Sequence, residues 1–240
     1  MFDDLGGFPV TRRWPPKRAG VIQLYTLNTP NGFKASIMLE ECGLDYDAHR
    51  ISIGDPEDQM TPEFLSLNPN GKIPAILDPN GPGGKPLPLF ESGAILQYLG
   101  VKSGRFYPAD ARGKVEVDQW LFWQVGGLGP MLGQHGHFKL YAPDRIAYAT
   151  ERYRTETLRL YGVLDRQLAQ NEHVAGADYS IADMAIWPWY GGLVLQECMR
   201  KLRTFAELKG RKYELKLYVW LASDGQVTRL QVRGTPDQAE

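Results

Sequence analysis

Cysteine is scarce in this sequence. Only Cys42 and Cys198 occur among its 240 residues, and neither belongs to a C-x-x-C pair. Two cysteines are too few for a framework of disulfide bonds. The simplest compartment for the chain is therefore a reducing cytoplasm.

An excess of charge and a long apolar run are also missing. The net charge is −1 with 23% charged residues, which gives no indication of nucleic acid or an anionic membrane as a partner. No apolar run is long enough to span a bilayer, and the start of the chain lacks the apolar core of a signal peptide. With 43% hydrophobic residues, the chain can bury one large core or two small ones.

The secondary-structure signals in the sequence change along the chain. Strand and helix signals alternate in the order βαβαββα, with strands expected at 21–26, 46–53, 72–78 and 87–90 and helices at 33–43, 61–69 and 91–104. From 113 to about 170 the apolar residues follow helical spacing only. This switch predicts an irregular arm at 1–20, an α/β domain at 21–104 and an all-α domain at 113–199.

The segment 200–240 departs from that pattern. Apolar side chains alternate there with polar ones, at Tyr213, Leu215, Leu217, Val219 and Leu221. Asp224-Gly225 then supplies a hairpin turn. A strand signal after a helical domain is atypical, and it leaves open a diverged terminus, a fused one or a reading-frame accident.

Three short motifs carry the candidate chemistry. Thr29-Pro30-Asn31-Gly32 joins the first strand to the first helix, and by itself this stretch favours an ordinary helix cap. A proline at position 74 is unusual in a strand, and a cis Ile73–Pro74 bond at the start of that strand explains it. The backbone of Ile73 is then free to pair with an extended peptide, although an edge-strand proline without a ligand is an equal alternative.

Glu91 and Ser92 form the third motif, between the fourth strand and the next helix. Ser92 is a natural N-cap, and free N–H groups at a helix N-terminus favour a carboxylate. Glu91, directly before it, can accept an ammonium group. The pair suits an α-amino acid group, and a plain helix cap is the alternative.

Taken together, these features suit a binding site for an extended, thiol-bearing peptide with an α-amino acid end. The chain resembles the glutathione transferases. The likeness is closest to the bacterial Nu-class branch, which includes glutathione-dependent disulfide-bond oxidoreductases. It rests on "LYTLNTPNGFKASIMLEE", "EFLSLNPNGKIPAI", "LFESGAILQYL", "WLFWQVGGLGPMLGQ", "YATERYRTETLRLYGVLD" and "YSIADMAIWPW". The resemblance implies a thioredoxin-like N-terminal domain followed by a helical glutathione transferase C-terminal domain.

The resemblance also implies roles for individual residues. Thr29 and Asn31 would act as the catalytic residues by donating hydrogen bonds to the glutathione sulfur, which lowers the pKa of its thiol. Glutathione would be held by Gln59, Lys72, Ile73, Glu91, Ser92 and Arg152. Structural roles would fall to Pro74 and to a capping box formed by Ser180 and Asp183.

As implied function we expect a cytoplasmic homodimer that reduces disulfides with glutathione, in its reduced or disulfide form, and uses no protein cysteine. Conjugation of small electrophiles to glutathione is the nearest alternative. A non-catalytic binding module of the same fold is a third. We expect no metal, because His135-Gly136-His137 has no further ligand at a suitable spacing.

Overall fold

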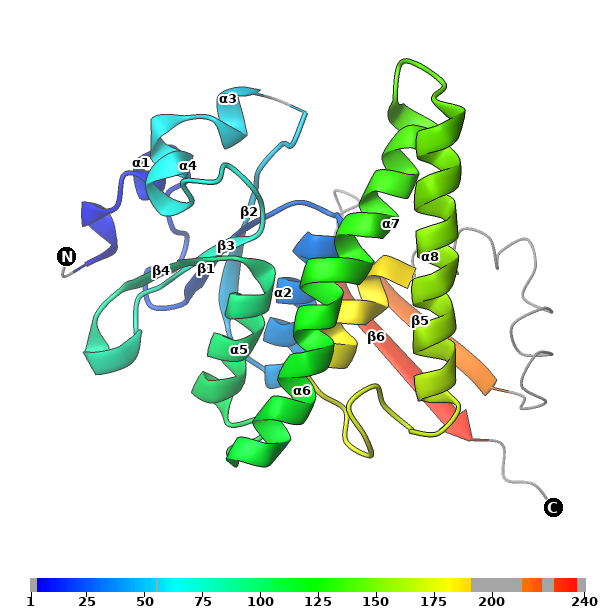
Figure 1. The fold of residues 1–240 in the computed structure, drawn as a ribbon. Helices are drawn as coiled ribbons and strands as arrows, with labels where there is room; N and C mark the ends of the chain where they lie inside the picture. Colours follow the sequence, from blue (N-terminus) through cyan, green and yellow to red (C-terminus); the bar gives the residue numbers. More distant parts are fainter. Residues whose placement is uncertain (1–3, 55, 191–212, 222–226, 237–240) are drawn as a thin grey trace. The chain divides into compact units, whose positions relative to one another are not determined.

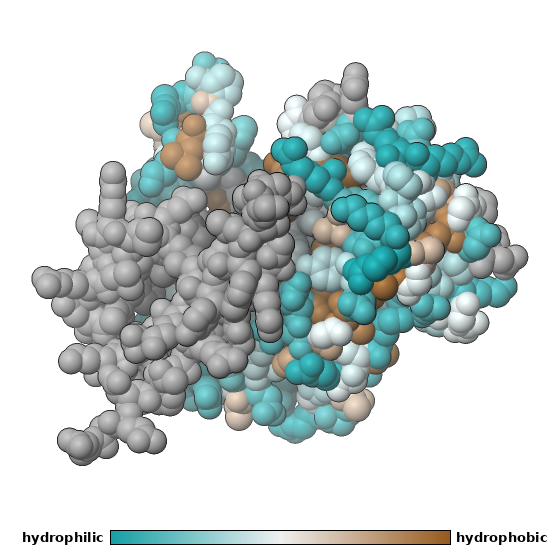
Figure 2. Space-filling view, turned by 180° about the vertical axis from the view of Figure 1, so that it is seen from behind, coloured by the Kyte–Doolittle hydropathy of each residue, from teal (hydrophilic) through white to brown (hydrophobic). Residues whose placement is uncertain are grey.

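The computed structural model of the protein describes residues 4–54, 56–190, 213–221 and 227–236. The chain divides into two compact units, Met1–Trp189 and Tyr190–Glu240. No helix in the described ranges is long and apolar enough to cross a bilayer. On the face drawn in Figure 2, hydrophobic residues are interspersed among hydrophilic ones.

A four-stranded sheet organises the first part of unit 1 (Figure 1). Its strands are β1 (Ile22–Thr26), β2 (Tyr46–Arg50), β3 (Ala75–Asp78) and β4 (Leu87–Phe90), in the order β2-β1-β3-β4. β1 and β2 are parallel, and the other two pairs are antiparallel. The βαβαββα order and the thioredoxin-like fold predicted from the sequence are confirmed.

Helices cover both faces of this sheet (Figure 1). α2 (Pro30–Cys42) and α5 (Ser92–Ser103) pack against each other on one face, and each ends at a glycine in the left-handed conformation, Gly43 and Gly104. The other face is covered by α4 (Pro62–Leu67) and the N-terminal segment. Short elements at α3 (Pro56–Gln59) and a 3-10 turn (Pro82–Gly84) complete the connections.

The N-terminal segment, expected to be irregular, contains a 3-10 turn at Leu5–Gly7 and the short helix α1 (Val10–Arg13). Leu5, Phe8 and Val10 are buried in a cluster with Tyr25 and Phe64, among others. Apolar contact with the sheet therefore orders this segment, and composition alone does not reveal such contact.

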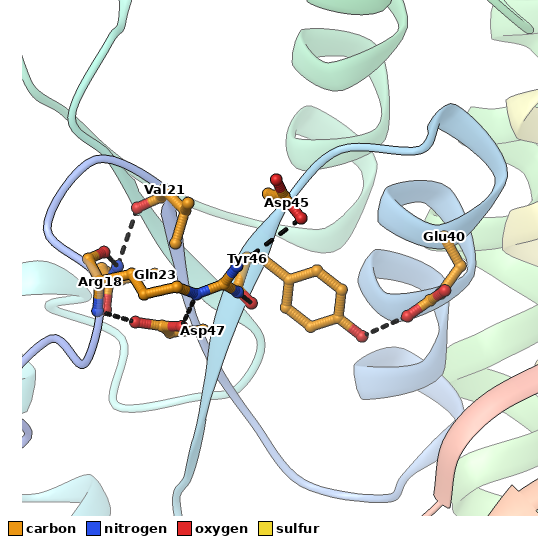
Figure 3. A network of polar contacts seen from close by, with 7 residues as sticks. All are labelled: Arg18, Val21, Gln23, Glu40, Asp45, Tyr46 and Asp47. Carbon is orange, nitrogen blue, oxygen red and sulfur yellow. Dashed lines mark hydrogen bonds and ion pairs between the residues drawn. The ribbon is translucent and has the colours of Figure 1, made fainter.

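A polar network fastens the end of this segment to β2 (Figure 3). The backbone N–H and the Nε of Arg18 donate to the two carboxylate oxygens of Asp47, at 2.6 and 2.9 Å. Arg18 Nη2 also donates to the carbonyl of Tyr46, at 2.6 Å. On the other side of β2, the hydroxyl of Tyr46 donates to Glu40 of α2 at 2.9 Å. The strand is thus tied to the elements on both sides of it.

The second part of unit 1 is helical, as predicted. α6 (Ala111–Trp123) leads through a π-helical segment (Gln124–Leu128) into α7 (Gly129–Gly136), and a second π segment (His137–Tyr141) precedes α8 (Ala147–Leu168). Residues 181–190 form a further helix. The packed faces carry apolar side chains at helical spacing, among them Val117, Leu121, Leu128, Leu132, Leu160 and Leu164.

The helix at 181–190 begins at the predicted capping box. Asp183 Oδ2 accepts from the backbone N–H of Ser180 at 3.0 Å, as expected. Ser180 Oγ instead accepts from the N–H of Ala182, at 3.3 Å, so the box is not fully reciprocal. The other oxygen of Asp183 accepts from the N–H of Val174 at 2.8 Å, which fixes the preceding loop to the helix start.

Unit 2 contains two antiparallel strands, β5 (Tyr213–Leu221) and β6 (Val227–Pro236). The strand signal at the end of the chain is thereby confirmed. The predicted turn at Asp224-Gly225 lies outside the described residues, as does Cys198.

A buried lysine joins the α/β part of unit 1 to its helical part. Lys34 of α2 is 1% exposed, and its Nζ hydrogen-bonds Ser92 Oγ at 3.3 Å and Gln124 Oε1 at 2.5 Å. Burial lowers the pKa of Lys34 to about 7, against the opposing effect of the Glu91 carboxylate. Desolvation disfavours the ammonium form, and these oxygens compensate for it only in part.

This lysine predicts a pH-dependent stability. Its pKa in the folded protein, about 7, lies below the value of about 10.4 in an unfolded chain. Between these two values the unfolded state binds more protons, so the free energy of unfolding rises with pH. Relative to Lys34→Met, the wild-type value should rise by up to about 1.4 kcal/mol per pH unit above pH 7.

Urea unfolding at several pH values between about 7 and 9 measures this difference. The matched control is Lys17→Met, at an exposed lysine, which should keep the wild-type slope. Equal slopes for wild type and Lys34→Met would mean that Lys34 does not titrate in this range.

Candidate functional site

Thr29, in the turn between β1 and α2, is the N-cap of α2. Thr29 is extended (φ −129°, ψ 163°), and its Oγ1 accepts from the N–H of Gly32 at 3.1 Å. The cap is therefore confirmed. α2 begins at Pro30, three residues earlier than predicted, because proline is pre-organised for the first helical position. A hydroxyl that accepts one hydrogen bond can still donate another, so the cap does not exclude a ligand.

Close packing fixes the backbone of this turn. A Cβ added to Gly32 would lie 2.0 Å from the carbonyl oxygen of Leu27 and 2.6 Å from Thr26 Oγ1. Only glycine permits this approach. The helix start is therefore held against the end of β1.

The side chain of Asn31 is hydrogen-bonded to a residue in the helical part of unit 1. Its Oδ1 accepts from Trp189 Nε1 at 3.1 Å, across 158 positions in the sequence. Both side chains are partly buried. The asparagine amide can still donate through its Nδ2, so the turn presents a hydroxyl and an amide as donors to an anion.

Glu91 is the strained residue of the site. It occupies the N-cap position of α5 with φ 69° and ψ 116°, and its exposed side chain makes no capping hydrogen bond. A non-glycine residue at positive φ costs about 1–3 kcal/mol, and such residues cluster at ligand sites. The strain leaves the carboxylate exposed next to the N-terminus of a helix.

The prediction that Ser92 is the N-cap is wrong. Ser92 is the first residue of α5, 7% exposed, and its Oγ accepts from Lys34 Nζ. Since the turn before the helix is formed by Glu91 at positive φ, the cap position passes to Glu91. Ser92 nevertheless stays at the helix N-terminus, where a buried ammonium adds positive charge to the N–H groups.

The third motif lies before β3. The Ile73–Pro74 bond is cis, as predicted, and Pro74 is buried. Lys72 is exposed, and its carbonyl accepts from Asn68 Nδ2 at 2.5 Å. Gln59, 8% exposed, lies at the end of α3. Its carbonyl oxygen is 3.3 Å from where a Cβ on Gly71 would be, so the end of α3 and the loop that carries Lys72 are adjacent.

The register of the strands brings the three motifs together at one end of the sheet. Ala75 of β3 pairs with Tyr25 of β1 and with Phe90 of β4. Both pairs are antiparallel, so Pro74 lies between the end of β1, which leads into the Thr29 turn, and Glu91. Segments separated by more than sixty residues in the sequence therefore meet at one end of the sheet.

Arg152 lies on a different element from the other predicted ligand residues. It is exposed on α8, where it helps to lower the pKa of Glu156 after the larger effect of a hydrogen bond from Arg159. Its neighbours on α8 form ion pairs within the helix, Arg154 with Glu151 and Arg159 with Glu156. The described ranges of the chain contain no group of three or more His, Cys, Asp or Glu arranged to hold a metal ion.

The sequence did not identify Lys34, Gln124 or Trp189 as site residues. Lys34 and Gln124 lie on helix faces that are otherwise apolar, and a lone polar residue in such a stripe is the available signal. For Trp189 the sequence offers no such signal, because an indole gives no sign in the sequence of its hydrogen-bond partner.

Comparison with known proteins agrees with this geometry. Residues 29–102 match the family described as "Glutathione S-transferase, N-terminal domain". The chain is 53% identical over 170 residues to disulfide-bond oxidoreductase YfcG of Escherichia coli K12, covering 70% of this chain and 79% of that protein. It is 50% identical over 180 residues to disulfide-bond oxidoreductase YghU of the same organism, covering 72% of this chain and 62% of that protein.

A solved structure agrees as well. A glutathione transferase from Pseudomonas putida, with one glutathione disulfide bound per subunit, is 52% identical and superposes with a TM-score of 0.78. The match covers 86% of this chain and 90% of that one. The chain belongs to the glutathione transferase family.

Proposed function

We propose that the protein is a glutathione-dependent disulfide-bond reductase of the Nu type. The observation that carries the proposal is the meeting of the Thr29 turn, the cis Pro74 and Glu91 at one end of the sheet. The names of two relatives at about half identity, both disulfide-bond oxidoreductases, support the reaction class. The bound glutathione disulfide of the Pseudomonas putida protein supports the ligand.

The residues at this edge fit glutathione from one end to the other. Glu91 accepts its ammonium group, and the N-terminus of α5 with Ser92 and Lys34 receives the adjacent carboxylate. The backbone of Ile73 pairs with its extended peptide, and Gln59 at the end of α3 and Lys72 in the adjacent loop flank it. Thr29 and Asn31 then donate to its sulfur. Arg152, on α8, is the last residue that we propose to contact glutathione.

The role of Thr29 and Asn31 is electrostatic. A free thiol has a pKa of about 8.5, and donors at a helix N-terminus lower it because they stabilise the thiolate. When bound, glutathione supplies this thiolate, which attacks one sulfur of a small disulfide while the other sulfur leaves and takes a proton from water. A second glutathione thiol completes the reduction and leaves as glutathione disulfide. No proton acceptor on the protein is needed.

No protein cysteine is required in this scheme. Cys42 lies at the far end of α2 from Thr29, and its Sγ is 3.2 Å from Ser103 Oγ. Burial raises the pKa of its thiol, which disfavours the nucleophilic form.

We further propose that the protein is cytoplasmic, because cysteine is scarce, and that it is a homodimer, because of the family resemblance. Cell fractionation tests the location, and analytical ultracentrifugation tests the oligomeric state.

The first test compares two activities of the wild type and of a variant with Cys42→Ala and Cys198→Ala. Reduction of a model disulfide, coupled to glutathione reductase, should exceed conjugation to an aromatic halide, and the variant should keep its reductase rate. A folded variant that loses more than about tenfold, or about 1.4 kcal/mol, contradicts the cysteine-free scheme. Conjugation without reduction would indicate a transferase, and neither activity would indicate a binding module.

A second prediction concerns the amino-acid end of glutathione. Ser92→Ala and Glu91→Gln should each weaken glutathione binding by about 1–3 kcal/mol, as expected for a lost hydrogen bond to a charged group. Titration calorimetry measures this change. Glu172→Gln, at an exposed carboxylate, is the control and should bind as the wild type does. Unchanged affinity in both site variants would place the amino-acid end elsewhere.

A third prediction separates activation from capping at the turn. If Thr29 and Asn31 donate to sulfur, Thr29→Ala and Asn31→Ala should raise the pKa of the bound thiol. The rise in reductase rate then moves to higher pH, while glutathione affinity changes little. Thr29→Ala should also cost about 1 kcal/mol of stability, because the cap is lost, and Thr29→Ser should restore both properties. If both alanine variants melt earlier but keep the wild-type pH profile, the turn is only a cap.

A further inference from the structure

The side chain of Asn31 accepts a hydrogen bond from Trp189, a residue that has no role in the function proposed above. We propose that Trp189 is a positioning residue, which orients the Asn31 amide so that its N–H groups face the sulfur of the substrate thiol. The inference rests on the proposed role of Asn31 and adds the helical part of the unit to the thiol-activating machinery. Its physical basis is the hydrogen bond of 3.1 Å from Trp189 Nε1 to Asn31 Oδ1.

The chemistry of the two groups fixes which end of the amide points where. An indole N–H is a donor only, whereas an asparagine amide has an accepting oxygen and a donating nitrogen. The oxygen must therefore face Trp189, and the Nδ2 hydrogens are directed away from it. Among the described residues, Nδ2 has no protein acceptor.

An amide turned by 180° would have the opposite effect on a thiolate. Its oxygen would then face the sulfur and repel the negative charge, which raises the pKa of the thiol. Without a partner on one side, the two amide orientations differ little in energy, because the terminal torsion of asparagine is broad and two-fold. The hydrogen bond from Trp189 selects the orientation that stabilises the thiolate.

Trp189 is itself held in place by α7. A Cβ on Gly129 would lie 3.2 Å from the indole ring, and a Cβ on Gly133 would lie 3.5 Å from it. Glycines at these two positions let the ring approach the helix backbone. The helix that carries Trp189 starts at the Asp183 cap, and the turn that carries Asn31 is fixed by the close approach of Gly32 to Leu27. Both partners of the hydrogen bond therefore have fixed backbones.

The test is Trp189→Phe, which keeps an aromatic ring at this position and removes the N–H donor together with part of the indole ring. The pKa of the bound glutathione thiol, followed by the ultraviolet absorbance of the thiolate, should rise, and the rate profile should move to higher pH with it. The shift should not exceed that of Asn31→Ala. Trp14→Phe is the matched control, because Trp14 packs on Tyr25 and Phe64, and it should leave the profile unchanged.

A double variant distinguishes positioning from packing. If Trp189 acts through Asn31, Trp189→Phe should add nothing to the pKa of the bound thiol once Asn31 is alanine. The indole N–H resonance of Trp189 in the Asn31→Ala variant should also differ from its position in the wild type. A profile shift from Asn31→Ala but none from Trp189→Phe overturns this inference and leaves the proposed function standing. Additive shifts also overturn it, and no shift from Asn31→Ala removes the proposed role of Asn31 as well.

Discussion

The first two turns of α2 carry the contacts on which the rest of the site depends. Asn31 and Lys34 are three residues apart, so they lie on the same face of the helix. That face meets the helical part of the unit twice, through Trp189 and through Gln124. Lys34 also reaches Ser92 at the start of α5. The proposed sulfur end and amino-acid end of the ligand site are therefore both held in position by residues outside the sheet.

These contacts contribute little to the stability of the folded protein. Burying an ammonium group costs more than neutral hydrogen-bond acceptors return, which is why the pKa of Lys34 falls to about 7. Glu91 adds backbone strain at the same end of the sheet. Gln124 Nε2 is buried and without a partner among the described residues. Such costs are expected where a fixed arrangement of charge serves a ligand, because a pre-organised site does not have to reorganise when the ligand binds.

Local rules account for what the sequence could predict. The Thr29 cap, the glycines that end α2 and α5, the cis Pro74 and the alternation at 213–221 all depend on neighbouring residues only. The errors arise where a distant group intervenes. The second strand was expected to reach residue 53 but ends at Arg50, because the N–H of Ser52 donates to Asp58 at 2.9 Å. Ile51, beyond the end of the strand, is buried.

The contacts between the two parts of the unit lay beyond such rules. Lys34 and Gln124 are 90 positions apart, and Asn31 and Trp189 are 158 apart. Periodicity shows that a helix has an apolar face, but it does not show which residue on another helix will meet a polar side chain on that face. The same limit applies to Arg152, because the sequence pattern does not fix the distance between this residue and Glu91.

The position of Trp189 also bears on the atypical end of the chain. It is the last residue of unit 1, and every residue that meets at the sheet edge precedes it. A site built in this way needs the chain through Trp189, since removing the indole would free the Asn31 amide. The strands at 213–236 follow all of these residues in the sequence. The strand signal at the end of the chain and the proposed thiol site can therefore be explained separately.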